Sequence, residues 1–344
     1  MKKLAALAMA FALTAVTFAG CGDSDKQNNS NGNENNPVSQ DQADDGKTSA
    51  DEDTYVIGIC QLVEHEALDA ATQGFKDALK EKLGDKVEFK EQTAGGDSAT
   101  CATIVNQYVS ADVDLILANA TAPLQAAAGA TDQIPILGTS ITDYASALNM
   151  DDWTGTTGRN ISGTSDLAPL EEQAIMLHEL FPDAKNVGLI YCSAETNSVY
   201  QVDEVEAALL NLGYSCKRYT FADSNDIFTA VTNAVAECDV LYIPTDNAAA
   251  AATETINSIV EPAKKPVIAA EEGICRGCGV ATLSISYYDL GYETGLMAYE
   301  VLVNGADVST MPIKTIPVTK KYNAAMCESF GITDIIPDDY EAIE

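Results

Sequence analysis

The chain has few basic side chains. Its 344 residues include 19 lysines and arginines against 52 aspartates and glutamates, a formal net charge of −33 at pH 7. Arginine occurs only as Arg159, Arg218 and Arg276. Because the phosphates of nucleic acids are bound by clustered cations, this composition excludes nucleic acid as a partner.

The sequence motifs of several enzyme classes are also missing. There is no Gly-x-Ser-x-Gly nucleophile motif, no Gly-x-x-x-x-Gly-Lys phosphate loop and no Gly-x-Gly-x-x-Gly dinucleotide motif. Long apolar stretches are absent after the N-terminus, which excludes a membrane protein with several spans. We therefore expect a protein that is not an enzyme and that needs no cofactor.

The nine cysteines could be free thiols in the core, disulfide partners or metal ligands. Cys60, Cys192 and Cys238 lie in or beside apolar segments, where free thiols pack as small hydrophobic groups. Cys275 and Cys278 have a Cys-x-x-Cys spacing, which permits a local disulfide. No second pair and no nearby histidine complete a zinc motif, so we expect no metal site.

The N-terminus has the pattern of an export signal. Residues 1–20 contain two lysines followed by an apolar stretch of about fifteen residues, which is short for a membrane span. Cys21 directly follows Ala19 and Gly20, an arrangement that resembles the lipobox of bacterial lipoproteins. In that class the cysteine carries the lipid, which implies an anchor on the outer face of the cytoplasmic membrane. A plain signal peptide with a chance cysteine is the alternative.

Residues 21–53 form a break in composition. Residues 22–53 hold six asparagines and nine acidic residues, with no aromatic residue and no Ile, Leu or Met. Such a segment buries too little apolar surface to offset the entropy of ordering. We interpret it as a disordered spacer ahead of a folded body.

The folded body shows alternating strand and helix patterns. Strand patterns lie at 55–60, 87–89, 114–118, 134–137, 187–191, 214–221, 240–243 and 266–268. Helix patterns lie at 68–83, 98–110, 123–130, 169–180, 202–212, 227–238, 248–260 and 288–305. This rhythm predicts an α/β fold with two Rossmann-like lobes, each built on a parallel sheet.

A stretch rich in Gly, Ser and Thr near residues 155–168 suggests a hinge between these lobes. We expect an N-terminal lobe at 54–160 and a C-terminal lobe at 161–287. The helix and C-terminal segment at 288–344 would then be shared between them.

Polar side chains follow most of the predicted strands. In open α/β sheets, ligands bind beyond the carboxyl ends of the strands, so these side chains mark a candidate site. The candidate ligand-binding residues are Gln61, Glu64, His65, Thr121, Ala122, Thr142, Asp143, Asp166, Glu195, Asn197, Ser198, Asp246, Asn247 and Glu271.

The chemistry of these residues suits a zwitterion such as an amino acid. Thr121 is placed to cap a helix that contains Pro123 in its first turn, and the free N–H groups there favour a carboxylate. Asn197 and Ser198 stand at the start of another helix. Asp246 and Glu271 offer negative charge to an ammonium group. For any single residue, capping or turn formation is the alternative explanation.

Several segments together resemble one protein family. They are 64–69, 120–125, 140–143, 160–166, 191–198, 244–247 and 287–291. In order and spacing, residues 54–337 resemble the solute-binding proteins of ABC importers with the type I periplasmic-binding fold. The most similar group is typified by tryptophan- and tyrosine-binding lipoproteins.

The resemblance implies two lobes that close over one small molecule. It also implies an ABC permease and its ATPase as partners, and we expect a monomer. By the same resemblance, Asp246 would hold the ligand ammonium, with Glu271 nearby. Thr121, Thr142 and Ser198 would hold the carboxylate, and Glu64 and His65 would border the side-chain pocket.

Two departures from the family pattern bear on the ligand. Leu62-Val63 stand where relatives often carry an aromatic residue, and Glu66 stands where they usually have proline. An aromatic amino acid remains our expected ligand, with a branched-chain amino acid or another small organic acid as the alternative. A lipoprotein that reports its ligand to a signalling receptor is a second alternative, because one fold serves both roles.

Overall fold

The computed structural model describes residues 54–223 and 225–343. These described residues form one compact unit. The predicted signal peptide at 1–20, the lipidation site Cys21 and the spacer at 21–53 lie outside the described residues. None of the helices in the described part of the chain is long and apolar enough to span a membrane.

The first lobe is built on a five-stranded parallel sheet with the order β2-β1-β3-β4-β5. The strands are β1 (Tyr55–Gln61), β2 (Val87–Thr93), β3 (Leu115–Asn119), β4 (Ile136–Ile141) and β5 (Ile161–Ser165). The helices are α1 (Glu66–Leu83), α2 (Ser98–Ser110), α3 (Thr121–Ala130), α4 (Tyr144–Ala147) and α11 (Tyr287–Leu302). One apolar cluster joins the sheet to α1 and α11, and another joins it to α2 and α3. The sheet is therefore covered on both faces, as its continuous apolar strands require.

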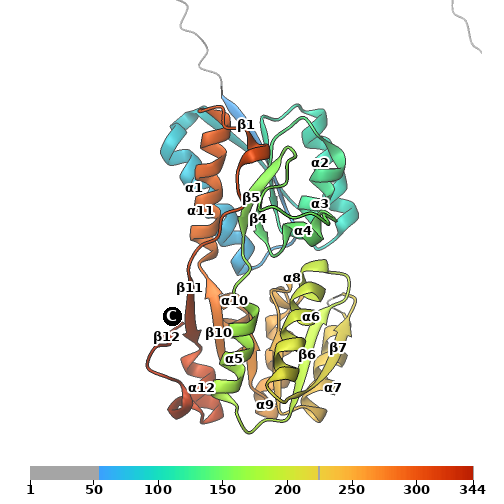
Figure 1. The fold of residues 1–344 in the computed structure, drawn as a ribbon, viewed down its shortest axis with the longest axis vertical. Helices are drawn as coiled ribbons and strands as arrows, with labels where there is room; N and C mark the ends of the chain where they lie inside the picture. The colour runs from blue at the N-terminus through green and yellow to red at the C-terminus, as the bar shows by residue number, and fades with distance from the viewer. Residues whose placement is uncertain (1–53, 224, 344) are drawn as a thin grey trace, which may run out of the picture. The chain divides into compact units, whose positions relative to one another are not determined.

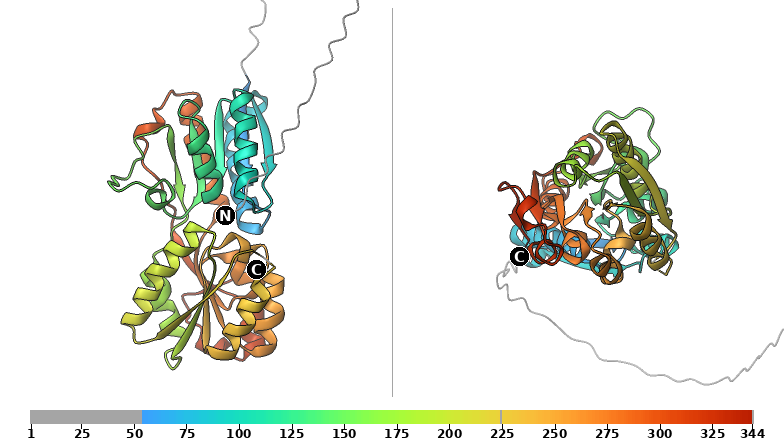
Figure 2. Two further views of the ribbon diagram at one scale, coloured as in Figure 1. Left: turned by 90° about the vertical axis from the view of Figure 1, so that its right-hand side faces the viewer. Right: turned by 90° about the horizontal axis from the view of Figure 1, so that it is seen from below.

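The second lobe is built on a seven-stranded sheet with the order β12-β11-β10-β9-β8-β6-β7. Its strands are β6 (Asn186–Cys192), β7 (Ser215–Phe221), β8 (Val240–Ile243), β9 (Val267–Ala269), β10 (Ala281–Ile285), β11 (Val318–Tyr322) and β12 (Glu341–Ala342). Its helices are α5 (Leu170–Leu180), α6 (Thr196–Asn211), α7 (Ile227–Glu237), α8 (Asn247–Ala250), α9 (Thr253–Ala263), α10 (Glu272–Cys278) and α12 (Ala324–Phe330). All pairings are parallel except that of β10 with β11. The prediction of two Rossmann-like α/β lobes is confirmed (Figures 1 and 2).

The path between the lobes differs from the expected one. Residues 161–165, which we expected in the second lobe, form β5 and pair with β4 in the first sheet. The serines, threonine and glycine of this strand resemble a linker in sequence, although Ile161 to Thr164 are buried. The hinge therefore follows Ser165 rather than preceding it.

The described chain passes between the lobes three times. After the first crossing it runs through the second lobe to β10, and it then returns to the first lobe with α11. Near Lys314 it pairs with β5, and it re-enters the second lobe as β11. The segment that follows β10 therefore contributes α11 to the first lobe and β11, α12 and β12 to the second.

Helices α1 and α11 lie in direct backbone contact. A Cβ atom added at Gly291 would collide with the carbonyl oxygen of Ala71, and one added at Gly74 would collide with the carbonyl oxygen of Tyr288. Glycine is therefore required at both positions for this approach. The contact holds α11, which is distant in sequence, against the first lobe (Figure 1).

We expect Gly291→Ala to lower the free energy of unfolding by about 1–3 kcal/mol, because the helices must move apart to admit the methyl group. Gly129→Ala is the matched control, since Gly129 is exposed on α3 with no atom within 4 Å of an added Cβ. It should be neutral or stabilise by about 0.5–1 kcal/mol. Urea unfolding of the three proteins measures both effects. Equal stability of Gly291→Ala and the wild type would contradict the close packing.

Candidate functional site

A small cavity lies where the carboxyl ends of the two sheets face each other. We call it the central cavity. Its polar lining residues come from both lobes and from the crossings between them. They are His65, Ser140, Thr142, Asp166, Asn197, Thr245, Asp246, Asn247, Glu271 and Tyr287.

A second, larger cavity adjoins it. This outer cavity shares Asn197 and Asn247 with the central cavity. Its first-lobe wall includes the apolar Leu62 and Val63, and its second-lobe wall includes Ala248. The outer cavity is thus the more apolar of two neighbouring compartments.

Most of the residues predicted from the sequence line one of these cavities. The central cavity contains His65, Thr142, Asp166, Asn197, Asp246, Asn247 and Glu271. The outer cavity contains Thr121, Ala122, Glu195, Asn197 and Asn247. Glu64 is exposed and lines a separate groove that also touches His65 and Glu271.

Besides Glu64, three predicted residues line neither cavity. The Gln61 side-chain amide donates to Asp69 Oδ1 at 2.6 Å, and its oxygen accepts from the Thr72 hydroxyl at 2.6 Å. Asp143 caps α4 through Ser146 N–H at 2.7 Å. Ser198 is fully buried. The Gln61 and Asp143 side chains thus stabilise the end of a strand and the start of a helix beside the cavities.

Three carboxyl groups are buried in the central cavity. Two of them accept hydrogen bonds from backbone N–H groups. Asp246 accepts from Cys192 N–H at 2.6 Å and from Ala249 N–H at 2.8 Å. Glu271 accepts from Gly273 N–H at 2.6 Å and from Ile274 N–H. Both therefore act as caps of the short helices α8 and α10.

Asp166 is different. Its Oδ2 atom accepts from the Tyr287 hydroxyl at 2.9 Å, whereas its Oδ1 atom is buried without a hydrogen-bond partner. The whole residue is 5% exposed. A buried carboxylate oxygen without a donor is costly, so this atom is available to a ligand.

Ser140 presents a second buried atom without a partner. Its Oγ atom has no hydrogen bond, and its backbone φ of 57° is unusual for a residue other than glycine. Ser140 lies on β4 and Asp166 follows the neighbouring strand β5, and both line the central cavity. We did not predict Ser140, Thr245 or Tyr287 as ligand residues, although all three lie in segments that carry the family resemblance.

Burial sets the protonation of this cavity. It raises the pKa of Asp166 to about 6, of Glu271 to about 7 and, together with the nearby Glu195 carboxylate, of Asp246 to about 8. Burial also lowers the pKa of His65, which favours its neutral form. The cavity thus contains several acidic groups without a neighbouring cation, and it favours a positively charged guest.

Two helix N-termini border the outer cavity. The N-cap residue of α3 is Ala120, with φ of 97°, and that of α6 is Glu195; neither makes a side-chain cap. The expectation that Thr121 caps α3 is therefore wrong, because Thr121 is the first helical residue. Uncapped N–H groups at a helix start favour a carboxylate.

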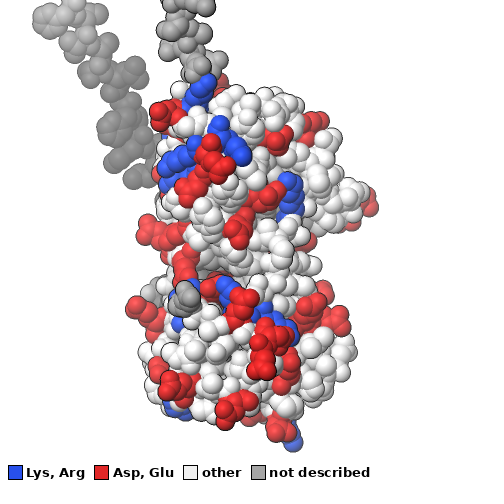
Figure 3. All heavy atoms as spheres, turned by 90° about the vertical axis from the view of Figure 1, so that its left-hand side faces the viewer, with Lys and Arg blue, Asp and Glu red and all other residues white. Residues whose placement is uncertain are grey.

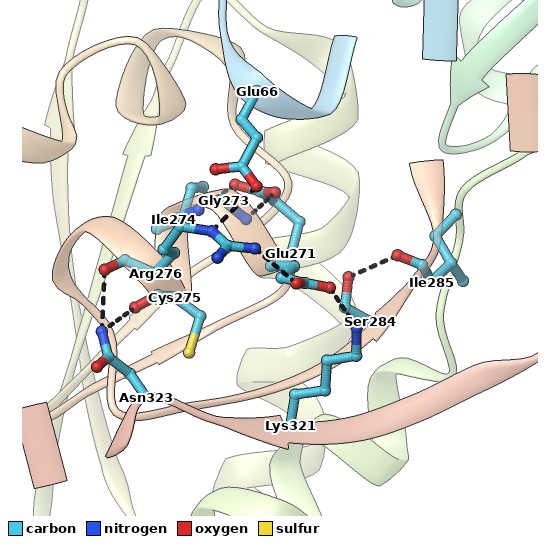
Figure 4. A network of polar contacts seen from close by, with 11 residues as sticks. Glu66, Glu271, Gly273, Ile274, Cys275, Arg276, Ser284, Ile285, Lys321 and Asn323 are labelled. Carbon is cyan, nitrogen blue, oxygen red and sulfur yellow. Dashed lines mark hydrogen bonds and ion pairs between the residues drawn. The ribbon is translucent and has the colours of Figure 1, made fainter. Parts of the chain in front are cut away.

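The two lobes touch each other around the cavities. His65 Nε2 lies 3.3 Å from Asn247 Oδ1, and Gln201 Nε2 donates to Thr142 Oγ1 at 3.1 Å. Glu66 of α1 forms an ion pair with Arg276 of α10 at 3.0 Å (Figure 4). These contacts enclose the central cavity between the lobes.

The cysteines near α10 are free thiols. None of the described cysteines forms a disulfide. All of them are buried except Cys216, which is half-buried. Burial raises the pKa of the Cys275 and Cys278 thiols. No group of three or more His, Cys, Asp or Glu residues within 54–223 and 225–343 has a geometry that could hold a metal ion.

Comparisons with known proteins agree with this architecture. Residues 56–333 match the family described as ABC transporter substrate binding protein. A curated protein of Clostridioides difficile (strain R20291), named tyrosine-binding protein, is 34% identical over 322 residues, which are 93% of this chain and 89% of that protein.

Two solved structures are similar in fold and sequence. A Streptococcus pneumonia ABC domain in complex with L-Trp is 29% identical and has a TM-score of 0.80, covering 84% of this chain and 100% of that one. A substrate-binding protein with adhesive properties from Clostridium difficile, in its ligand-free, open form, is 34% identical and has a TM-score of 0.64. That match covers 85% of this chain and 99% of the other.

The lobe arrangement resembles the ligand-bound structure more than the open one. The TM-score is higher against the L-Trp complex, although the open protein is closer in sequence. Together with the contacts between the lobes, this difference indicates a closed arrangement. In fold and in sequence over residues 56–333, the chain belongs to the family of ABC transporter substrate-binding proteins.

Proposed function

We propose that this protein binds an aromatic amino acid, Trp, Tyr or Phe, between its lobes and releases it unchanged to an ABC importer. The observation that carries this proposal is the pair of buried atoms without partners, Asp166 Oδ1 and Ser140 Oγ, in one cavity between the lobes. An ammonium group has the charge and the donors that both atoms lack. The relatives named for tyrosine and solved with L-Trp support an aromatic side chain.

We assign the ligand ammonium to Asp166 and Ser140 rather than to Asp246. The two oxygens of Asp246 already accept backbone N–H groups, and so do those of Glu271. These two carboxyl groups are then not assigned to direct contact with the ligand. We assign the ligand carboxylate to the helix starts near Thr121 and Asn197, with Thr142 nearby.

The ligand side chain is assigned to the outer cavity, beside Leu62 and Val63. An aliphatic wall accepts a ring by shape and area without stacking. The branched-chain alternative requires the same ammonium and carboxylate contacts, so only the side-chain compartment separates the two ligand classes. Binding would favour the closed state because both lobes contribute contacts there.

The first prediction is a ligand-specific stabilisation. Residues 51–344 are heated with each of the twenty amino acids, and we expect Trp, Tyr or Phe to raise the melting temperature. A ligand at 100 times its dissociation constant stabilises by about 2.7 kcal/mol. A shift with leucine, isoleucine or valine alone would support the branched-chain alternative. No shift with any amino acid, after unfolding and refolding to remove bound ligand, would reject the proposal.

The second prediction concerns Asp166. We expect Asp166→Asn to weaken ligand binding on the order of 10- to 100-fold, because it removes a charge-assisted hydrogen bond. In the wild type, the ammonium needs ionised Asp166, whose pKa in the ligand-free protein is about 6. The dissociation constant should therefore rise as pH falls below 6, by up to about tenfold per pH unit, and Asp166→Asn should lose this component.

Calorimetry from pH 5 to pH 8 measures both effects. Asp143→Asn is the matched control, since Asp143 caps α4 outside both cavities and asparagine also caps helices. If Asp166→Asn kept its affinity and Asp246→Asn lost binding, the ligand ammonium would instead be assigned to Asp246.

We further propose that the protein is a monomeric lipoprotein, held by lipid on Cys21 at the outer face of the cytoplasmic membrane, where it delivers ligand to an ABC permease and its ATPase. Membership of the substrate-binding family supports an extracytoplasmic location. The apolar segment before Ala19-Gly20-Cys21 supports the anchor.

The third prediction tests this anchor. Cys21→Ala should move the protein from the membrane pellet to the soluble extracytoplasmic fraction, while ligand binding stays unchanged. The Cys275→Ala variant serves as the control for loss of a cysteine elsewhere. Retention of Cys21→Ala in the pellet would contradict lipid attachment at this residue.

A further inference from the structure

An alternating set of charges joins the two lobes beside the central cavity (Figure 4). Arg276 of α10 donates from Nε to Glu66 of α1 at 3.0 Å and from a terminal nitrogen to Glu272 at 2.9 Å. Glu272 in turn pairs with Lys321 of β11 at 2.6 Å. The pair Glu66–Arg276 crosses between the lobes, whereas the other contacts lie within the second lobe.

The second lobe holds Arg276 in position. The Asn323 side-chain amide donates to the carbonyl oxygens of Cys275 and Arg276, at 3.1 Å and 2.9 Å. This bond ties the end of α10 to the segment after β11. The guanidinium is therefore presented toward α1 from a helix whose first turn is capped by Glu271, a residue of the central cavity.

The charge balance of the lobes makes this contact important. Residues 54–165 contain 15 acidic and 6 basic side chains, and residues 166–286 contain 18 and 6. Acidic side chains are spread over both lobes on the face that Figure 3 shows. Closing the lobes brings two negatively charged bodies together, which costs free energy at low ionic strength.

We propose that Glu66 and Arg276 form an inter-lobe latch that offsets this repulsion, favours the closed state and slows ligand release. The proposal rests on the proposed function for the identity of the ligand, but the latch acts on closure whatever the ligand is. Salt should weaken it, because the pair is partly exposed at 38% and 52% of the two side chains.

The contact region offers a reference for the closed state. A Cβ atom added at Gly273 would lie 3.4 Å from the Cβ atom of Glu66. This separation is close to the roughly 3.5–4.5 Å found in disulfides. The double variant Glu66→Cys/Gly273→Cys should therefore lock the lobes together when oxidised.

The test is a double-mutant cycle of Glu66→Gln, Arg276→Gln and both together, in residues 51–344. Spin labels at exposed Gln133 and Ser258 report the distance between the lobes, with the oxidised double-cysteine variant as the closed reference. In ligand-free protein at low salt, we expect each single variant to lower the closed-to-open ratio by about two- to fivefold. The double variant should lower it no further. High salt should remove the difference between the wild type and the variants, because it screens the ion pair.

Ligand release provides the second readout. Each single variant should speed dissociation by a similar factor, whereas Arg218→Gln should leave it unchanged. Arg218 is the matched control, because it pairs with Glu206 and Asp203 within the second lobe. The latch is contradicted if the wild type and the variants have the same closed fraction at low salt. It is also contradicted if the ligand-free wild type has no closed fraction. If no amino acid binds, the proposed function fails, and the ligand-free distances still decide the latch.

Discussion

The removal of carboxyl groups from water governs the site between the lobes. Asp246 and Glu271 tolerate burial because backbone N–H groups at the starts of α8 and α10 supply hydrogen bonds. Asp166 accepts from the Tyr287 hydroxyl, and its second oxygen remains without a donor. The cost of that burial persists until a charged donor arrives, so the ligand-free site is held in a less stable state than the bound one.

This same carboxyl group belongs to the hinge. Asp166 lies in the first crossing between the lobes, and Tyr287 begins the helix that follows the second crossing. The hydrogen bond between them joins two of the segments about which the lobes move. A ligand held by Asp166 would therefore contact the hinge as well as the cavity walls of both lobes. The same residues would then take part in ligand binding and in closure.

Much of this architecture could be predicted from the sequence, because buried parallel strands are continuous apolar runs and strand ends collect polar residues. The predictions failed for segments whose composition is not typical of the structure that they form in the folded protein. The strand β5 is rich in serine, threonine and glycine and resembled a linker. Ser140 could not be singled out because its backbone conformation and missing partner exist only in the folded protein.

The choice among the acidic residues shows the same limit. The sequence gives no reason to prefer Asp166 over Asp246 as the ligand residue. Only the hydrogen bonds in the folded protein show that Asp166 has an oxygen without a partner. The helix α10 was also missed, since its seven residues include two cysteines and two glycines and have no clear helical periodicity. Gln61 stands at a strand end like the true lining residues, yet its amide points into the first lobe toward Asp69.

The glycine contact between α1 and α11 has a consequence for how the chain acquires its structure. The first lobe begins at residue 55, but α11, which covers one face of its sheet together with α1, ends at Leu302. The chain must therefore traverse the whole parallel core of the second lobe before the core of the first is sealed. Such long-range closure raises the contact order and slows folding. During synthesis, the first lobe remains an incomplete, open layer until almost the entire polypeptide has emerged.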